Sequence, residues 1–424
     1  MKKTFSMISL GCPRNLVDSE CLISEFKKAG YRLKERAIGT DTVIINTCAF
    51  IEDAKKESID TILKVIDAKK SGSVKRIIVA GCLPERYTNE LESELKEIDE
   101  FRGVLDFKHT FKTHDTRTLT PRHYAYLKIS EGCRNTCTYC VIPRLKGPYT
   151  SRSIPSIVEE IKQLVHEDVK EIILVGQDTS LYGIDLYGKK KMAELLKTLE
   201  EISGKRWLRL LYCHPANLDK DVIKVIRDSG VLCRYVDLPI EHINNKILKR
   251  MGRRISRADI VSLIDNIRNE IKGAAVRTSI IVGFPGETEK DFMELLAFIE
   301  ETRFERLGLF KYSREEDTPA FRYEGQIPEK EKERRFAEAM SLQQKISAEI
   351  NEKLKGRTLK VLVESKEEDY YIGRTEYDAP EVDGSVYVKG RDLLLGTFYE
   401  ANIIDTYEYD LVGEVTPADR ERRS

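Results

Sequence analysis

Three cysteines lie within eight residues of one another, with spacings of four and then three residues: Cys133, Cys137 and Cys140. A compact loop can turn all three sulfur atoms onto one centre, and thiolates are the usual ligands of iron–sulfur clusters. Three ligands instead of four leave one iron of a cubane open to bind a small molecule. A structural zinc site is the alternative, but zinc normally takes a fourth ligand nearby, and the next histidine, His166, lies far along the chain.

A second set of cysteines is spread along the first hundred residues: Cys12, Cys48 and Cys82. Each follows an apolar run, so each is predicted to lie just past the C-terminal end of a parallel strand, where open α/β sheets place their ligand crevice. We therefore expect these thiols to converge on a second cluster, again with one open iron. Burial as small hydrophobic residues is the alternative for this set, and it is the interpretation adopted for Cys21, Cys213 and Cys233.

A third group of candidates follows the second predicted strand of the central region, in the order Gly176, Gln177 and Asp178. Glycine permits a ligand to approach the backbone closely, and the two polar side chains could bind a ligand's amino group. A plain strand-to-loop turn is the alternative. Tyr139, inside the cysteine triplet, completes the cofactor-binding candidates. Two histidines near strand ends, His214 and His242, are assigned no role.

The first hundred residues alternate between apolar runs and helical patterns. Met7–Leu10, Thr42–Ile45 and Arg76–Val79 are predicted strands, and Val17–Lys28 and Ala54–Ala68 are two of the helices between and after them. Strands that alternate with helices favour a parallel sheet built from βαβ units. The strand-end cysteines would then lie along one edge of that sheet.

Six further apolar runs, each followed by helical sequence, begin near residue 124: Tyr124–Ile129, Glu171–Val175, Trp207–Tyr212, Tyr235–Leu238, Val276–Val282 and Arg306–Phe310. Six βα units are too few for a closed eight-stranded barrel, so we expect an open, partial (β/α)6 barrel. The cysteine triplet follows its first strand, on the face where barrel active sites lie.

A long charged helix, Glu329–Leu354, is followed by short alternating runs with glycine turns, which predict a small all-β barrel. These runs are Thr358–Val363, Ser385–Val388 and Glu400–Tyr407. The expected fold is therefore α/β: an N-terminal parallel-sheet domain over residues 1–105, a central partial barrel over 119–350 and a C-terminal β-barrel over 351–415. Residues 416–424 are predicted to be a disordered tail.

Composition limits the class of protein. Lys and Arg total 71 and Asp and Glu total 71, and a balanced chain has no global attraction to nucleic acid or anionic lipid. No apolar run approaches the 18 or so residues of a membrane span, so we expect a cytoplasmic protein without a membrane partner. In that compartment nine cysteines favour metal ligation or catalysis over a disulfide framework.

The C-terminal region departs from this balance. Residues 353–415 contain eight basic and fourteen acidic side chains, a net charge of −6. A barrel that gripped RNA should be basic, because phosphate neutralisation dominates such affinity. An acidic barrel suits a basic protein partner, and a solvated acidic face is the alternative.

These features together resemble a known family. The spacing of the triplet after a barrel strand is similar to the motif of the radical S-adenosylmethionine superfamily. An N-terminal domain with three strand-end cysteines and a small C-terminal barrel of the TRAM type make the whole resemble the methylthiotransferases, over residues 1 to about 415. The resemblance implies two 4Fe–4S clusters, one on each cysteine set, and S-adenosylmethionine as cofactor.

Two substrates are known in that family, a modified adenosine of transfer RNA and an aspartate of the twelfth small-subunit ribosomal protein. This chain resembles the ribosomal-protein enzymes, because Pro13 and Arg14 stand where the transfer-RNA enzymes typically have Gln and Met. The stretches Asp237–His242, Tyr312–Thr318 and Asp378–Gly384 are also similar to theirs. The order Gly-Gln-Asp at Gly176 departs from the Gly-Gly-Glu of many superfamily members, which leaves the amino-group contact open.

The resemblance implies a reaction in which the triplet's cluster reductively cleaves S-adenosylmethionine, and the radical so formed removes hydrogen from the β-carbon of the aspartate. The strand-end cluster would supply the sulfur, already methylated by a second S-adenosylmethionine. The implied partners are a basic ribosomal protein, free or within the small subunit, and a flavodoxin- or ferredoxin-like electron donor. The rival functions are a transfer-RNA adenosine methylthiotransferase and a non-catalytic zinc- or cluster-containing ribosome-binding protein.

Overall fold

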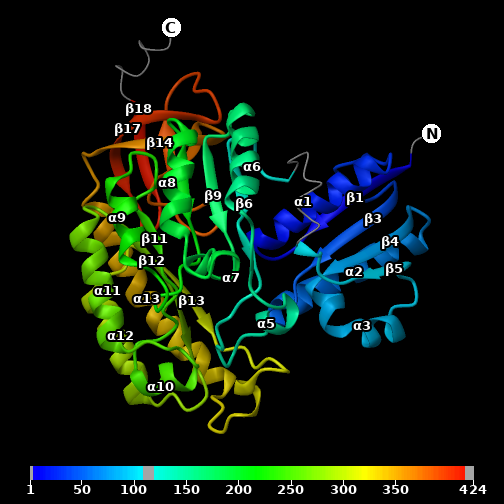
Figure 1. Ribbon diagram of the computed structural model, residues 1–424, viewed down its shortest axis with the longest axis horizontal. Helices are drawn as coiled ribbons and strands as arrows, with labels where there is room; N and C mark the ends of the chain where they lie inside the picture. Colours follow the sequence, from blue (N-terminus) through cyan, green and yellow to red (C-terminus); the bar gives the residue numbers. More distant parts are fainter. Residues whose placement is uncertain (1–2, 108–118, 416–424) are drawn as a thin grey trace.

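The computed structural model describes residues 3–107 and 119–415, so the predicted tail at 416–424 lies outside the described residues. Figure 1 shows three parts: an N-terminal α/β part in blue, a central barrel from teal through green to orange-yellow, and a small C-terminal barrel in orange and red. In the part of the chain that the structure describes, no helix has the length and apolar character needed to cross a membrane.

The N-terminal part is one parallel sheet with the strand order β2-β1-β3-β4-β5. From β1 the chain adds β2 on one side of the sheet and then β3, β4 and β5 on the other side. The point between β1 and β3 where the order switches is where doubly wound sheets open their ligand crevice. The elements are β1 (Thr4–Ser9), α1 (Pro13–Lys28), β2 (Arg32–Leu33), β3 (Thr40–Thr47), α2 (Glu52–Lys70), β4 (Val74–Gly81), α3 (Cys82–Glu94) and β5 (Glu100–Arg102).

The central part has the six parallel strands expected from the sequence. They form two three-stranded ladders, β10-β9-β6 and β11-β12-β13, which a parallel bridge between Leu208 and Leu232 brings together. The strands are β6 (Tyr124–Lys128), β9 (Glu171–Val175), β10 (Trp207–Leu210), β11 (Tyr235–Asp237), β12 (Ala275–Val282) and β13 (Arg306–Lys311).

Helices cover the outside of these strands, because each carries an apolar face that packs on the barrel. The long ones are α6 (Ile154–His166), α8 (Met192–Ser203), α9 (Lys220–Asp228), α11 (Arg257–Glu270), α12 (Glu289–Thr302) and α13 (Glu329–Glu352). The short elements lie in the loops at the strands' C-terminal ends and after them: β7 (Ser130–Glu131), α5 (Ile142–Leu145), β8 (Thr150–Ser151), η1 (Thr179–Leu181), α7 (Ile184–Tyr187), α10 (Asn245–Arg250) and η2 (Pro319–Arg322).

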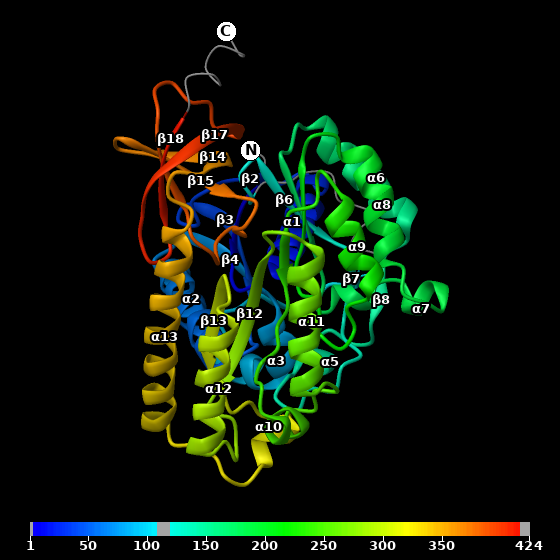
Figure 2. The ribbon, with the colours of Figure 1, turned by 90° about the vertical axis from the view of Figure 1, so that its left-hand side faces the viewer.

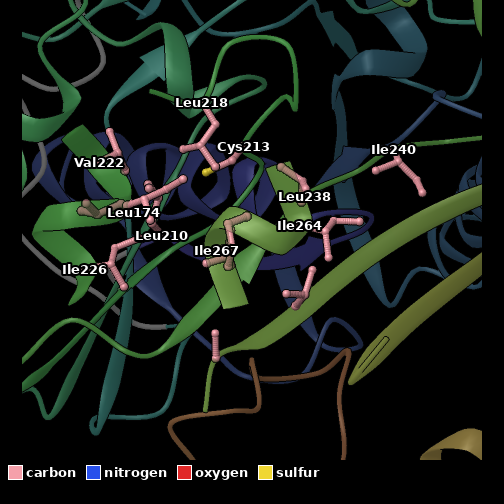
Figure 3. Close-up of a cluster of buried hydrophobic side chains, with 14 of the residues drawn as sticks. Leu174, Leu210, Cys213, Leu218, Val222, Ile226, Leu238, Ile240, Ile264 and Ile267 are labelled. Carbon is pink, nitrogen blue, oxygen red and sulfur yellow. The ribbon is translucent and has the colours of Figure 1, made fainter. Parts of the chain in front are cut away.

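The main hydrophobic core lies between the central strands and these helices. Figure 3 shows the sulfur of Cys213 among the side chains of Leu174, Leu218 and Leu238, and Cys213 is only 1% exposed. Cys21 and Cys233 are buried in a neighbouring apolar cluster. The expectation that these three cysteines serve as core residues agrees with their surroundings.

The C-terminal part is a closed five-stranded barrel with the order β14-β15-β16-β18-β17, closed by the antiparallel pairing of β14 with β17. Two of its strands, β15 and β18, lie outside the apolar runs named from the sequence. The strands are β14 (Thr358–Glu367), β15 (Tyr370–Thr375), β16 (Val386–Lys389), β17 (Thr397–Thr406) and β18 (Leu411–Val415).

Buried ionic contacts fix the C-terminal barrel against the N-terminal ends of the central strands. Glu171, the first residue of β9, accepts hydrogen bonds from Arg209 and from Arg374 of β15, each at 2.6 Å. Asp378 pairs with Arg306, the first residue of β13, and the Tyr235 hydroxyl donates to Asp383 at 2.6 Å. Several of the acidic residues counted in this region therefore face the central barrel instead of solvent.

Candidate active site with two cysteine sets

The register of the N-terminal sheet aligns the strand-end cysteines. Thr47 of β3 lies opposite Gly81 of β4, so Cys48 and Cys82, the next residues, leave the sheet side by side. Gly11, after β1, has a φ of 88°, and a Cβ there would lie 2.6 Å from Cβ of Cys48. Only glycine permits this approach, and it brings the loop with Cys12 against Cys48. The structure thus brings all three thiols to one edge.

The electrostatics of the strand-end set are uneven. Burial alone would raise the pKa of Cys12, but the adjacent Arg14 guanidinium outweighs it, aided by the Asn15 amide and by Lys146, and the pKa of Cys12 is lowered. Burial raises the pKa of Cys48 to about 12, and the charge of Cys12 adds to this shift. Cys12 is therefore the thiol of this set most easily ionised.

Arg14 also joins the strand-end set to the central barrel. Its Nη1 donates to the carbonyl oxygen of Gly176 at 3.3 Å, and its guanidinium carbon lies 4.5 Å from the centre of the Tyr212 ring. One side chain therefore touches a proposed cluster ligand and the backbone of the cofactor candidate Gly176. Sequence reasoning noted Arg14 only as a family-like residue, and no local signal could have revealed contacts so distant in sequence.

A buried group of four charges lies at the same junction. Lys128, which is fully buried, pairs with Asp18 of α1 and Glu131 of β7. Lys146 pairs with Asp18 at 3.0 Å and with Glu131 at 4.0 Å. Two cations and two carboxylates satisfy one another here, as buried charges must. A lysine at the end of the apolar strand 124–128 was the available sequence signal, and it was missed.

The cysteine triplet forms the loop between β7 and α5. The backbone N–H of Cys140 donates to the carbonyl of Cys137 at 3.2 Å, which curls the loop. Asn135 donates to Cys133 Sγ from its backbone and its side chain, both at 3.4 Å. Arg253 Nη1 lies 3.7 Å from Cys137 Sγ. Burial raises the pKa of Cys133, and nearby Asp178 and Cys137 raise it further.

The three residues after β9 lie beside the triplet. A Cβ at Gly176 would lie 2.4 Å from Ser130 Oγ, so the backbone is tightly held there. Asp178 accepts from the amides of Asn135 at 2.7 Å and Asn217 at 2.8 Å, and thereby orients Asn135 toward Cys133. Gln177 donates its amide hydrogen to Glu131, while its Oε1 is a buried acceptor without a partner among the described residues.

Tyr139 lies on the inner side of the triplet loop. Its ring meets Phe284 edge-on with centroids 6.3 Å apart, and its hydroxyl contacts Glu241, whose pKa burial raises. Glu241 and Tyr212, both at the C-terminal ends of barrel strands, have positive φ values of 69° and 62°. Such strained backbone is typical of functional sites.

The donor set fits iron–sulfur clusters better than single metal ions. Within residues 3–107 and 119–415, no three His, Cys, Asp or Glu side chains close on one metal-ion position. A four-iron cluster spaces its thiolates more widely than one ion does, and each cysteine set offers three thiols and no other ligand type. Gln177 Oε1 adds an unpartnered acceptor beside the triplet.

Three family models match consecutive parts of the chain. The radical SAM superfamily matches residues 127–299, an uncharacterized protein family, UPF0004, matches residues 4–103, and the TRAM domain matches residues 356–416. The strand-end cysteines lie in the second of these and the triplet in the first.

The chain is similar to relatives over almost its full length. The ribosomal protein uS12 methylthiotransferase RimO of Clostridioides difficile is 46% identical, with 96% of this chain and 97% of the relative covered. The same-named protein of Cytophaga hutchinsonii is 43% identical, with 98% of each covered.

A solved structure shows the fold. The radical S-adenosylmethionine methyltransferase TsrM from Kitasatospora setae has a TM-score of 0.54 at 14% identity, over 76% of this chain and 77% of that one. The fold match at 14% identity shows the fold alone, whereas identities of 43–46% over nearly the full chain show the family. The chain therefore belongs to the ribosomal protein uS12 methylthiotransferase family of radical S-adenosylmethionine enzymes.

Proposed function

We propose that this protein transfers a methylthio group to the β-carbon of an aspartate in ribosomal protein uS12. The observation that carries the proposal is the joint presence of two three-thiol sets, linked by Arg14, in a chain 46% identical to a uS12 methylthiotransferase. A transfer-RNA methylthiotransferase is the rival function, but the relatives from Clostridioides difficile and Cytophaga hutchinsonii are named for the ribosomal protein.

The two cysteine sets have separate roles in this proposal. The triplet Cys133, Cys137 and Cys140 would hold the cluster that cleaves S-adenosylmethionine, and Cys12, Cys48 and Cys82 would hold the sulfur-supplying cluster. When bound, these groups supply a carbon radical and a sulfur atom, which is chemistry that protein side chains lack. The chain's contribution is to position and orient the reacting groups and to exclude water from them.

Specific residues carry that contribution. Gln177 Oε1 is free to accept a hydrogen bond from the ammonium group of S-adenosylmethionine, and the glycine at position 176 lets the backbone next to Gln177 pack against Ser130. Asp178 supports the triplet indirectly, since its two oxygens already accept hydrogen bonds from Asn135, Asn217 and Ser180. Arg14 stabilises the thiolate form of Cys12, which is the form that binds iron.

The three parts divide the remaining work. We propose domains at 1–105, 119–350 and 351–415, acting in the cytoplasm. The C-terminal barrel contacts the N-terminal ends of the central strands, opposite the end that carries the triplet. It can therefore bind a basic protein without covering the cofactor site.

The mass of uS12 tests the proposal. With the gene present, the target aspartate should carry the added mass of one methylthio group, and deletion should remove that mass. A deletion strain with unchanged uS12 and a lost methylthio-adenosine in transfer RNA would instead establish the rival function. Anaerobic reconstitution without iron–sulfur absorbance and without cleavage of S-adenosylmethionine would favour a non-catalytic ribosome-binding protein.

A further inference from the structure

A hollow of about 510 Å³ opens beside the triplet loop and has a basic lining. Thr136, which lies between Cys133 and Cys137, forms one wall, and the segment after α10 forms the other with Lys249, Arg253 and Arg254. Arg253 is buried, whereas Lys249 and Arg254 are exposed. The hollow is therefore a cationic surface that reaches the loop of the proposed cofactor-cleaving cluster.

The hollow's wall is held firmly against the cysteine loop. The backbone N–H of Thr138 donates to the carbonyl of Met251 at 2.9 Å, and the Thr138 hydroxyl donates to the carbonyl of Arg250 at 2.8 Å. A Cβ at Gly252, where φ is 72°, would lie 2.6 Å from the carbonyl oxygen of Thr136. This contact needs glycine, so the basic segment and the triplet loop form one rigid unit.

The exposed charges of the hollow lack partners in the described part of the chain. No ion pair joins Lys249 or Arg254 to a carboxylate there, although most nearby cations are engaged: Lys246 pairs with Asp291 and Arg257 with Glu294. Asp259, the one carboxylate of the lining, is occupied by Ser256 at 2.6 Å. In a chain of zero net charge, unpaired cations at one place indicate a surface for an acidic partner.

We propose that this hollow is the docking site of an acidic one-electron donor protein carrying a flavin or an iron–sulfur cluster. The inference rests on the proposed function, because reductive cleavage of S-adenosylmethionine consumes one electron. The donor is oxidised by one electron, the sulfonium is reduced by it, and one carbon–sulfur bond breaks to give methionine and a carbon-centred radical. Electron transfer weakens steeply with distance, and Thr136 places this surface against the triplet loop.

The opposite end of the molecule is less suitable. Figures 1 and 2 show α10 at one end of the central barrel and the C-terminal barrel at the other. An acidic electron donor would be repelled by the exposed acidic residues of the C-terminal barrel, such as Glu367, Glu368 and Asp369. Donor and basic substrate would thus bind separate surfaces of opposite charge.

The test compares two reductants on the cluster-loaded enzyme. The variant Lys249→Glu with Arg254→Glu should raise the concentration of reduced flavodoxin needed for half-maximal cleavage by about tenfold or more at low salt, because electrostatic steering is reversed. Dithionite, a small reductant that needs no docking surface, should drive cleavage in the variant at the wild-type rate. A matched control, Lys162→Glu with Lys197→Glu on α6 and α8, changes the net charge by the same amount at a place away from the hollow. It should alter neither the flavodoxin concentration needed for half-maximal cleavage nor the dithionite-driven rate.

Binding to the protein without clusters gives a second readout. Calorimetry with oxidised flavodoxin should show binding whose affinity falls as the salt concentration rises. This affinity should be lost in the double variant Lys249→Gln with Arg254→Gln, which neutralises the two charges instead of reversing them. Unchanged flavodoxin-driven cleavage and binding in both pairs would overturn the docking site. The docking site would also be overturned if these variants lost affinity for an RNA oligonucleotide but retained their binding of flavodoxin. Failure of dithionite to drive cleavage in the wild type would instead refute the proposed function, so the two failures are distinguishable.

Discussion

The two cysteine sets reach similar ends by different structural means. The triplet depends on one short loop, curled by its own backbone and held by Asn135 and Arg253. The strand-end set depends on a whole sheet, since its thiols leave three separate strands whose register must be kept. A loop site can be recognised from spacing, whereas a strand-end site exists only once the domain has folded.

The electrostatic surroundings differ as well. Burial raises the pKa of Cys133 in the triplet, and burial raises the pKa of Cys48 in the strand-end set. The pKa of Cys12, in contrast, is lowered, because Arg14 and Lys146 outweigh its burial. Arg14 contacts the Gly176 carbonyl of the central barrel, and Lys146, which belongs to that barrel, pairs with Asp18 of α1. The strand-end set is therefore coupled to the junction with the central barrel, while the contacts of the triplet loop lie within that barrel.

The largest expected effect separates the two sets by activity. Cys137→Ala should abolish cleavage of S-adenosylmethionine, because the triplet would lose a cluster ligand. Cys12→Ala should abolish methylthio transfer while leaving cleavage by the triplet in place. Assays of released 5′-deoxyadenosine and of modified uS12 check this split. Loss of cleavage in Cys12→Ala would show that the two sets do not act independently.

Removal of one of the junction's two cations should be the next largest effect. Lys146→Met leaves the buried carboxylates of Asp18 and Glu131 undercompensated, which should lower the free energy of unfolding by about 3–5 kcal/mol. Denaturant unfolding of the cluster-free protein measures this loss in the free energy of unfolding. Lys70→Met, which breaks an exposed pair with Glu97, is the matched control and should have little effect. Equal stability of the two variants would contradict a structural role for the junction.

A smaller effect is expected where the strand-end loop meets Cys48. Gly11→Ala forces a positive φ on alanine and places its Cβ 2.6 Å from Cβ of Cys48, which should cost about 2 kcal/mol of stability. Gly147→Ala also has a positive φ but no neighbour within 4 Å, so it should cost about 1 kcal/mol. Thermal unfolding of both variants shows whether the close approach adds to the backbone strain, and equal losses would mean that it does not.

The smallest expected effect concerns thiol ionisation. Arg14→Gln removes the positive charge that favours the Cys12 thiolate, so the pKa of Cys12 should rise. In the cluster-free protein, alkylation of Cys12 at pH 8 should therefore slow, with its pH midpoint moved upward. Cys48, whose pKa is raised to about 12, should stay unreactive and serves as internal reference. An unchanged midpoint would mean that Arg14 does not control this thiol.

The sequence predicted the elements well where periodicity is strong. Glu171–Val175 is a strand with the same bounds in the structure, and the other five central strands lie within a residue or two of their predicted positions. Local patterns suffice where burial on both faces makes a parallel strand an apolar run, as in β9. The strands β15 and β18 were not predicted, since the first mixes Tyr, Gly and Arg and the second interrupts its apolar residues with Gly413 and Glu414.

Local sequence patterns could not predict contacts between residues far apart in the chain. Arg14 and Gly176 are 162 residues apart, and nothing in either local sequence indicates that they touch. The net charge of −6 in residues 353–415 was read as a surface property, but Asp378 and Asp383 are buried against arginines of the central barrel. Charge counting cannot distinguish a solvated carboxylate from one that holds two domains together.

The central claim is that the two cysteine sets hold two separate clusters. Iron content with Mössbauer spectra of two triple variants tests it most directly, one lacking Cys12, Cys48 and Cys82 and the other lacking Cys133, Cys137 and Cys140. Each should retain roughly half of the wild-type iron as one 4Fe–4S cluster, and only the first should change its spectrum when S-adenosylmethionine is added. Full iron content in either variant, or its complete loss in both, would contradict the account.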